Sequence, residues 1–172
     1  MNILNLWTAM ALASALTMSA AAQKADLSGT WHLNVSKSFL AAEHPSSDYR
    51  LTKIIAQKDG SIEQRDVAMH ASMAGIALPD SNTLMKFSTD GKENKLQVPV
   101  PFPGMPPMTV VVTAVWQADT LAVTERSNSF FGPATTDRRY FLSTNGLYLI
   151  ELVEGHNSFG DTEQRLVFDK QP

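Results

Sequence analysis

Short strand-like segments joined by tight turns run through almost the whole chain, and this pattern most limits the folds open to it. The pairs Asp59-Gly60, Asp90-Gly91 and Asn145-Gly146 are typical of hairpin turns, because these residues tolerate the positive φ angles that such turns need. The segments beside them alternate apolar and polar residues or are rich in Val and Thr. Beyond position 22, no stretch of twelve residues has helical periodicity. The pattern therefore predicts an all-β fold.

About ten strands are expected, most of them joined to their sequence neighbours by short turns. They cover residues 27–35, 49–57, 61–71, 83–88, 95–98, 108–117, 120–127, 136–143, 147–153 and 164–169. An antiparallel meander of this length must hide its edges, and closure into an up-and-down barrel of about eight to ten strands does so. Such a barrel either fills its interior with side chains or holds one small ligand. A β-sandwich is the alternative.

The first 22 residues form a segment of different character. They carry no charged side chain, and a short apolar stretch is followed by Ala20-Ala21-Ala22, the small residues that a signal peptidase recognises. The stretch is shorter than the roughly 20 apolar residues of a membrane span. We therefore expect residues 1–22 to be a signal peptide. Residues 23–172 then form one exported domain, periplasmic or secreted, with no transmembrane segment.

Composition excludes several classes of function. The chain has 172 residues, with 14 basic and 17 acidic side chains, so it lacks the positive charge that neutralises nucleic-acid phosphates. It has no cysteine, which excludes disulfides, thiol nucleophiles and cysteine-based zinc sites. Its four histidines are far apart in sequence and have no metal-binding spacing. The sequence therefore predicts no metal, no cofactor and no nucleic-acid partner, and it leaves the oligomeric state open.

A motif at the first expected strand carries a family resemblance. Ser28-Gly29-Thr30-Trp31 resembles the Gly-x-Trp signature of lipocalins and other calycin-like barrels. The resemblance implies that Gly29 lets the chain enter the barrel tightly and that Trp31 packs across its closed end. It also implies that Arg165 is the arginine that stacks on the tryptophan. These three residues are the structural positions that we predict.

Two further segments bear on the same resemblance. Residues 136–140 are similar in part to the second lipocalin motif, Thr-Asp-Tyr, with two arginines before the tyrosine. Residues 29–38 are closer to exported bacterial domains, described as lipocalin-like, that begin Gly-Thr-Trp-x-Leu-Asn-x-x-Lys-Ser. The chain ends shortly after Asp169 and lacks the long helix that follows a lipocalin barrel. The resemblance implies a fold, and a fold does not fix a function.

Two connections between strands are rich in large apolar side chains. Residues 98–112 place these side chains among several prolines, and a second connection at residues 130–131 is aromatic. In a meander barrel such loops flank the mouth and contact an apolar ligand or partner. The alternative is a loop folded over the barrel end as a plug. The predicted ligand-binding residues are Phe102, Met105, Met108, Phe130 and Phe131.

Charge is concentrated on one expected hairpin. One strand carries Glu125 and Arg126, and the next carries Asp137, Arg138 and Arg139. A residue of this group that faces inward would form a buried ion pair or anchor a ligand carboxylate. The alternative is a set of cross-strand pairs on a solvated outer face.

Three functions remain after these exclusions. The first is a binding module for a small hydrophobic molecule, which the turns, the Gly-Thr-Trp start and the apolar loops favour. The second is a barrel enzyme with an interior acid–base site that uses His70, Glu125 or one of the paired arginines. The third is an interaction or envelope-associated domain that docks another protein through its proline-rich loop or an edge strand. No nucleophile motif demands catalysis, so the sequence favours a non-enzymatic binding module and predicts no catalytic residue.

Overall fold

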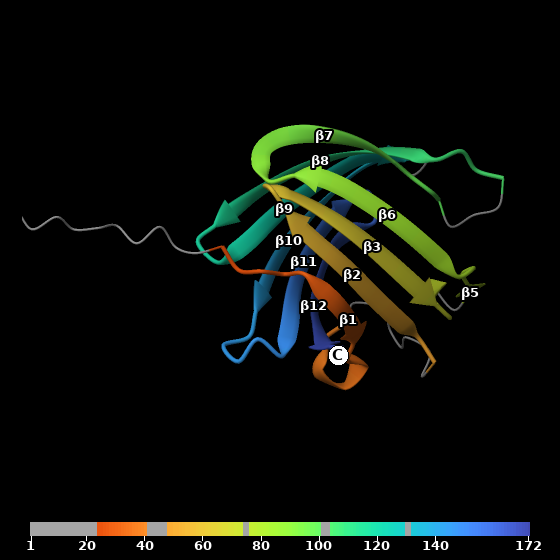
Figure 1. The fold of residues 1–172 in the computed structure, drawn as a ribbon. Helices are drawn as coiled ribbons and strands as arrows, with labels where there is room; N and C mark the ends of the chain where they lie inside the picture. Colours follow the sequence, from red (N-terminus) through yellow and green to blue (C-terminus); the bar gives the residue numbers. More distant parts are fainter. Residues whose placement is uncertain (1–23, 41–47, 74–75, 101–103, 130–131) are drawn as a thin grey trace, which may run out of the picture.

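The computed structural model describes residues 24–40, 48–73, 76–100, 104–129 and 132–172, which lie mostly in β-strands (Figure 1). Ten of the described strands form one sheet: β1 (Gly29–Leu33), β2 (Arg50–Lys58), β3 (Ser61–Met69), β6 (Ser81–Ser88), β7 (Asp90–Val98), β8 (Met108–Gln117), β9 (Thr120–Ser129), β10 (Gly132–Leu142), β11 (Tyr148–Asn157) and β12 (Gly160–Lys170). Two short strands, β4 (Ser72–Met73) and β5 (Ile76–Ala77), pair separately, and a 3₁₀ turn, η1 (Val35–Lys37), follows β1. No helix in the described residues is long and apolar enough to cross a membrane.

The large sheet is an antiparallel meander in the order β6-β3-β2-β1-β12-β11-β10-β9-β8-β7. Its two edge strands, β6 and β7, are consecutive in the chain, are joined through Thr89 alone, and contact each other. The sheet therefore curls until its edges meet, and it forms a nearly closed up-and-down barrel (Figure 1). The predicted all-β barrel fold is confirmed.

One predicted hairpin is wrong, because the strands on either side of its turn do not pair with each other. The turn at Asp90-Gly91 was expected to pair the strands on either side of it, but β6 pairs with β3 and β7 pairs with β8. The Asp90 carboxylate accepts hydrogen bonds from the Ser88 hydroxyl and the Lys92 amide, and the register of β7 shifts between Asp90 and Glu93. A bulge of this kind bends the strand locally. The segment therefore carries the chain from one sheet edge to the other.

The two ends of the barrel differ in their connections. Four short turns lie at one end, which we call the turn end: β2–β3, β6–β7, β8–β9 and β10–β11. The β2–β3 turn has positive φ at both Asp59 (48°) and Gly60 (76°), as predicted for a two-residue hairpin. The three longest connections, β1–β2, β3–β6 and β7–β8, lie at the other end, the loop end. The last two of these are on the right of Figure 1.

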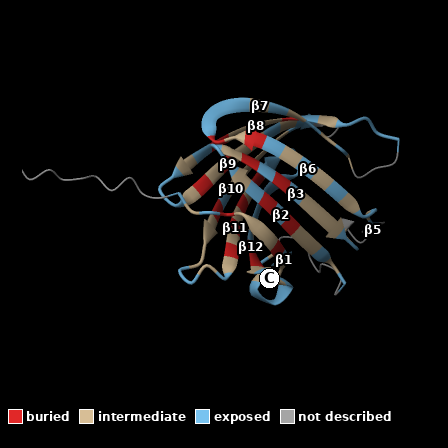
Figure 2. Ribbon diagram, in the orientation of Figure 1, coloured by how far each residue is buried: buried red, intermediate tan, exposed pale blue. Residues whose placement is uncertain are grey.

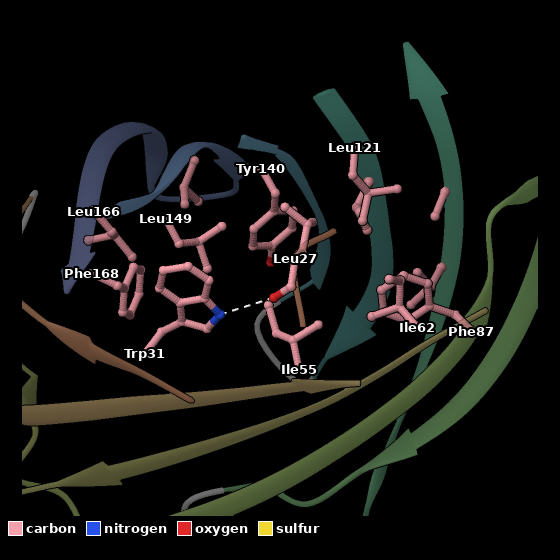
Figure 3. Packing of buried hydrophobic residues seen from close by; sticks show 14 of the residues in the cluster. Leu27, Trp31, Ile55, Ile62, Phe87, Leu121, Tyr140, Leu149, Leu166 and Phe168 are labelled. Atoms are coloured by element: carbon pink, nitrogen blue, oxygen red, sulfur yellow. Dashed lines mark hydrogen bonds between the residues drawn. The ribbon is translucent and has the colours of Figure 1, made fainter. Parts of the chain in front are cut away.

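The hydrophobic core fills the turn half of the barrel. Buried positions alternate with exposed ones along β2 and β3, as a sheet with one buried face requires (Figure 2). Trp31 is fully buried, and its indole N–H donates to the Leu27 carbonyl at 3.0 Å (Figure 3). Gly29 holds a φ of +145° at the start of β1. Around Trp31 and Leu27, the core contains Ile55, Ile62, Phe87, Leu121, Tyr140, Leu149 and Phe168.

Candidate functional site

A row of five charged side chains crosses the barrel interior, and we call it the charged chain. It runs Asp66–Lys53–Glu151–Arg138–Glu125, so that carboxylates and cations alternate. The Lys53 ammonium lies 2.8 Å from Asp66 and 3.4 Å from Glu151. The Arg138 guanidinium lies 2.6 Å from the other oxygen of Glu151 and 2.9 Å from Glu125. Each cation is therefore held between two carboxylates.

Strand alternation places these side chains inside the barrel. Lys53 occurs two residues before Ile55 on β2, so the two share the inner face. Glu151 lies between the buried Leu149 and Val153 in the same alternation on β11. Residues opposite each other in a ladder lie on the same face of the sheet, so the remaining members also face inward. Asp66 is opposite Lys53, and Glu125 is opposite the buried Val112. Arg138 occurs two residues before Tyr140, which is opposite Glu151.

The charged chain joins opposite walls of the barrel. Lys53 and Asp66 come from β2 and β3, whereas Glu151, Arg138 and Glu125 come from β11, β10 and β9. Strands β1 and β12 separate β2 from β11 in the sheet, so the contact between Lys53 and Glu151 crosses the interior. The other three contacts of the row lie within the walls, between strands that pair along the meander. The cross-interior contact is the one that depends on how the sheet curls between β2 and β11.

Aromatic rings surround the middle of the charged chain. The Lys53 ammonium is 5.6 Å from the ring centroids of both Tyr140 and Phe168. Rings at this distance attract a cation through their negative faces, and burial strengthens the attraction. Lys53 is 1% exposed and Glu151 0% exposed. The centre of the row is therefore enclosed, with aromatic side chains on the turn side.

One oxygen of the charged chain lacks a hydrogen bond. Glu151 Oε1 accepts from Arg138 Nη1 at 2.6 Å, but Oε2 accepts from none of the described residues. The Lys53 ammonium lies 3.4 Å from Oε2 but directs its hydrogen bonds to the two oxygens of Asp66. A buried carboxylate oxygen without a donor is unusual, because leaving it unpaired costs free energy. Within the described residues, Oε2 therefore has charge compensation from Lys53 but no hydrogen bond.

The electrostatic environment keeps Glu151 ionised. Burial alone would raise the pKa of Glu151, but the charges of Lys53 and Arg138 outweigh it and lower the pKa below its ordinary value. Burial and the negative charge of Glu151 raise the pKa of the Tyr140 phenol well above its usual range. Burial, with Asp66 and Glu151, also raises the pKa of Tyr49. At neutral pH the site therefore contains charged carboxylates beside protonated phenols.

Access to the charged chain comes at its ends. The side chains of Asp66, Arg138 and Glu125 are 25%, 24% and 15% exposed. Towards the loop end, most inward-facing residues are half-buried, although Val110 and Val153 are buried; the half-buried ones include Leu51, Thr83, Val98, Met108 and Thr136. In the turn half, most of the corresponding positions are buried. The charged chain therefore lies between a packed half of the barrel and a half that solvent reaches.

Two of the predicted ligand-binding residues, Met105 and Met108, lie at this same loop end. Phe102, Phe130 and Phe131 lie outside the described residues. Met105 is 42% exposed, and Met108, the first residue of β8, is half-buried and packs against the core. Their role in binding stays a prediction.

The predicted tryptophan partner lies on the outer face of β12. Arg165 is exposed, and its guanidinium donates to the Lys37 carbonyl at 3.2 Å. The cation over the Trp31 ring is Lys170, whose ammonium is 5.2 Å from the ring centroid at the turn end.

The charged hairpin of the sequence divides between the two faces of the sheet. Glu125 and Arg138 face inward and pair, which is the buried arrangement that the sequence left open. Arg126 pairs with Glu93 at 2.6 Å and Arg139 pairs with Glu154, and all four of these side chains are on the solvated outer face.

Sequence reasoning missed Lys53, Asp66 and Glu151, although the sequence holds a signal for them. Lys53 is two residues from Ile55, and Glu151 is two residues from both Leu149 and Val153, so each charged residue shares a strand face with apolar ones. A charged residue at an apolar position of a strand is rare unless it is paired. Three such residues on different strands point to a shared interior site.

His70, the candidate general base, is not part of the charged chain. It is exposed at the end of β3 with a φ of 55°, and its backbone N–H donates to Asp80. In the part of the chain that the structure describes, no group of three or more His, Asp or Glu residues is arranged to hold a metal ion.

A hollow of about 220 Å³ lies on the outer face of β10–β12. Phe39, Leu152 and Arg165 line it, together with the solvated Arg139–Glu154 pair. Arg139 and Glu154 already pair with each other in water, where such pairs contribute little. The interior row is therefore the stronger candidate site.

The barrel is compatible with a lipocalin-like fold. No protein-family model matches the chain, and a search of curated proteins finds no relative.

Proposed function

We propose that this protein is a binding module that holds a small molecule with an apolar body in the loop half of the barrel, above the charged chain. The observation that carries the proposal is the gradient of burial along the inner face, from packed at the turn end to half-buried at the loop end. Apolar walls with a few convergent polar groups are typical of small-molecule sites. Leu51, Val98 and Met108 supply the walls, and Asp66, Arg138 and Glu125 supply accessible polar atoms.

An interior acid–base enzyme is the second candidate. Glu125, Arg138 and Glu151 converge within hydrogen-bond distance, as that hypothesis required. A general acid or base works best with a pKa near the operating pH. The lowered pKa of Glu151 and the strongly raised pKa of Tyr140 move both groups away from neutrality. The electrostatics therefore favour binding over catalysis.

We also propose that the domain acts outside the cytoplasm, after cleavage of residues 1–22. The basis is the uncharged apolar start followed by Ala20-Ala21-Ala22. The test is the intact mass of the protein isolated from the periplasm or medium of an expressing bacterium. An intact mass that matches a chain beginning at Gln23 supports the proposal, and full-length protein retained in the cytoplasm contradicts it.

The binding proposal is tested with the neutral apolar probe N-phenyl-1-naphthylamine, whose fluorescence rises in an apolar site. We expect saturable uptake by the wild type and at least about tenfold weaker uptake by Met108→Asp, because a charge on the inner wall opposes an apolar occupant. Leu84→Asp is the matched control, since Leu84 is 48% exposed and faces outward on β6. Absence of uptake, with no organic molecule extracted from the purified protein, would overturn the proposal.

A further inference from the structure

We infer that the ligand carries a cationic, hydrogen-bond-donating head, such as an alkylammonium group, which binds against the charged chain. This inference rests on the proposed binding function and specifies the chemistry of the ligand. It differs from the carboxylate anchor that the charged hairpin first suggested. Three properties of the row lead to it: net charge, accessible atoms and an unfilled acceptor.

The net charge of the row is negative. It holds three carboxylates, Asp66, Glu125 and Glu151, and two cations, Lys53 and Arg138, which leaves one net negative charge (−3 + 2 = −1). A buried charge is costly unless an opposite charge compensates it. A cationic head would bring the row to neutrality, whereas a carboxylate head would double the excess.

The accessible atoms also favour a cation. Both ends of the row are carboxylates, and both are partly exposed, Asp66 at 25% and Glu125 at 15%. Lys53 is buried, and Arg138, although 24% exposed, already donates three hydrogen bonds to Glu125 and Glu151. A head group that enters from the loop end therefore finds acceptors at both ends of the row and no unpaired cation in it.

The unfilled acceptor is Glu151 Oε2. It is fully buried inside the row and accepts no hydrogen bond from the described residues. An ammonium head on Asp66 would compete for the carboxylate that now takes both hydrogen bonds of Lys53. Lys53 could then turn its hydrogen bonds to Glu151 Oε2, which lies 3.4 Å away. Ligand binding would thus satisfy the buried oxygen through a protein donor already in place.

The experiment compares three ligands with the same chain and different heads: decylamine, decanol and decanoate. Each ligand competes with N-phenyl-1-naphthylamine for binding to the whole mature chain, residues 23–172, at pH 7. We expect decylamine to displace the probe at a concentration at least about tenfold below that of decanoate, with decanol between them. The ratio of the amine and carboxylate concentrations is the quantity measured.

Two variants of equal charge change locate the preference. Glu125→Gln removes the excess charge of the row, and we expect the ratio to fall at least about fivefold. Glu93→Gln removes an exposed carboxylate of the outer Arg126 pair and should leave the ratio unchanged. Circular dichroism checks that each variant is folded, and Asp66→Asn replaces Glu125→Gln if the latter does not fold.

The outcomes separate the two proposals. If the probe itself does not bind, the proposed function fails. If the probe binds but decanoate or decanol matches decylamine, the cationic head is wrong and the binding function survives. If Glu93→Gln lowers the ratio as much as Glu125→Gln, the preference comes from the overall charge and the assignment to the charged chain is wrong.

Discussion

Each of the three inner residues of the charged chain is held between two charged neighbours. Lys53 contacts Asp66 and Glu151, and Arg138 contacts Glu151 and Glu125, so no cation depends on a single partner. Glu151, fully buried, depends on both cations. Removal of either cation would leave a buried carboxylate with too little compensation. At the scale of single residues, the row is therefore sensitive to the loss of any inner member.

Lys53→Met tests this sensitivity. The methionine keeps most of the apolar stem but leaves the buried Glu151 with Arg138 alone, so we expect the free energy of unfolding to fall by about 3–5 kcal/mol. Equilibrium unfolding in urea measures the change. Lys86→Met is the control, because the Lys86–Glu63 pair is exposed and its loss should change stability by less than about 0.5 kcal/mol. Equal losses in the two variants would contradict the argument.

His156 offers a test on the outer surface. A hydrogen bond to Asp161 at 2.9 Å, strengthened by that carboxylate's charge, raises the pKa of His156 above 6.5. The pairing of protonated His156 with Asp161 therefore contributes its full stabilisation below pH 6.5. This contribution to stability is lost as the pH rises through the raised pKa of His156. In an NMR titration, Asp161→Asn should bring the pKa back towards 6.5. Asp119→Asn, in the β8–β9 turn, should not, and an unshifted pKa in Asp161→Asn would refute the pairing.

At the scale of elements, the sequence predicts strands well where apolar and polar side chains alternate. It predicts them poorly where only backbone hydrogen bonds between the strands define the segment. The β2–β3 hairpin follows its Asp59-Gly60 signal. The β11–β12 hairpin extends beyond the predicted segments 147–153 and 164–169, as far as Asn157 and Gly160. Its outer part is polar, so backbone hydrogen bonds and not apolar alternation define it. A pattern of side chains cannot reveal such a segment.

A close contact in this extended hairpin is testable. Gly155 on β11 is opposite Thr162 on β12, and a Cβ at Gly155 would lie 2.6 Å from the Thr162 hydroxyl oxygen. We expect Gly155→Ala to cost about 1–3 kcal/mol in unfolding free energy, since the added methyl must displace that side chain.

The companion variant is Thr162→Ala, which removes the oxygen and leaves the β-carbon at 3.9 Å, an ordinary contact. The double variant should therefore recover most of the loss, and a double-mutant cycle from thermal unfolding gives the coupling. Additive losses in the cycle would show that the contact does not limit this hairpin.

At the scale of the whole molecule, the charged chain and the barrel depend on each other. The sequence predicted the barrel, with a β-sandwich as the alternative, because a long antiparallel meander hides its edges by closing on itself. It also marked Glu125 and Arg138 as a candidate buried pair. It could not predict the partner of that pair, because Lys53 and Glu151 lie on β2 and β11, which β1 and β12 separate, and they meet only when the sheet curls between them. The fold was therefore accessible from local patterns, whereas the site required the curvature of the sheet.

The seam between β6 and β7 is where closure is weakest, and amide hydrogen exchange tests it. Each of these edge strands pairs with one neighbour in the described sheet, so the N–H groups that face the seam lack a ladder partner. Strand β11 pairs on both sides along most of its length and carries the buried Glu151. We expect peptides covering β7 to exchange at least about tenfold faster than peptides covering β11, because local opening needs fewer broken bonds. Equal protection of the two strands would mean that the seam is hydrogen-bonded in solution and that the barrel is fully closed.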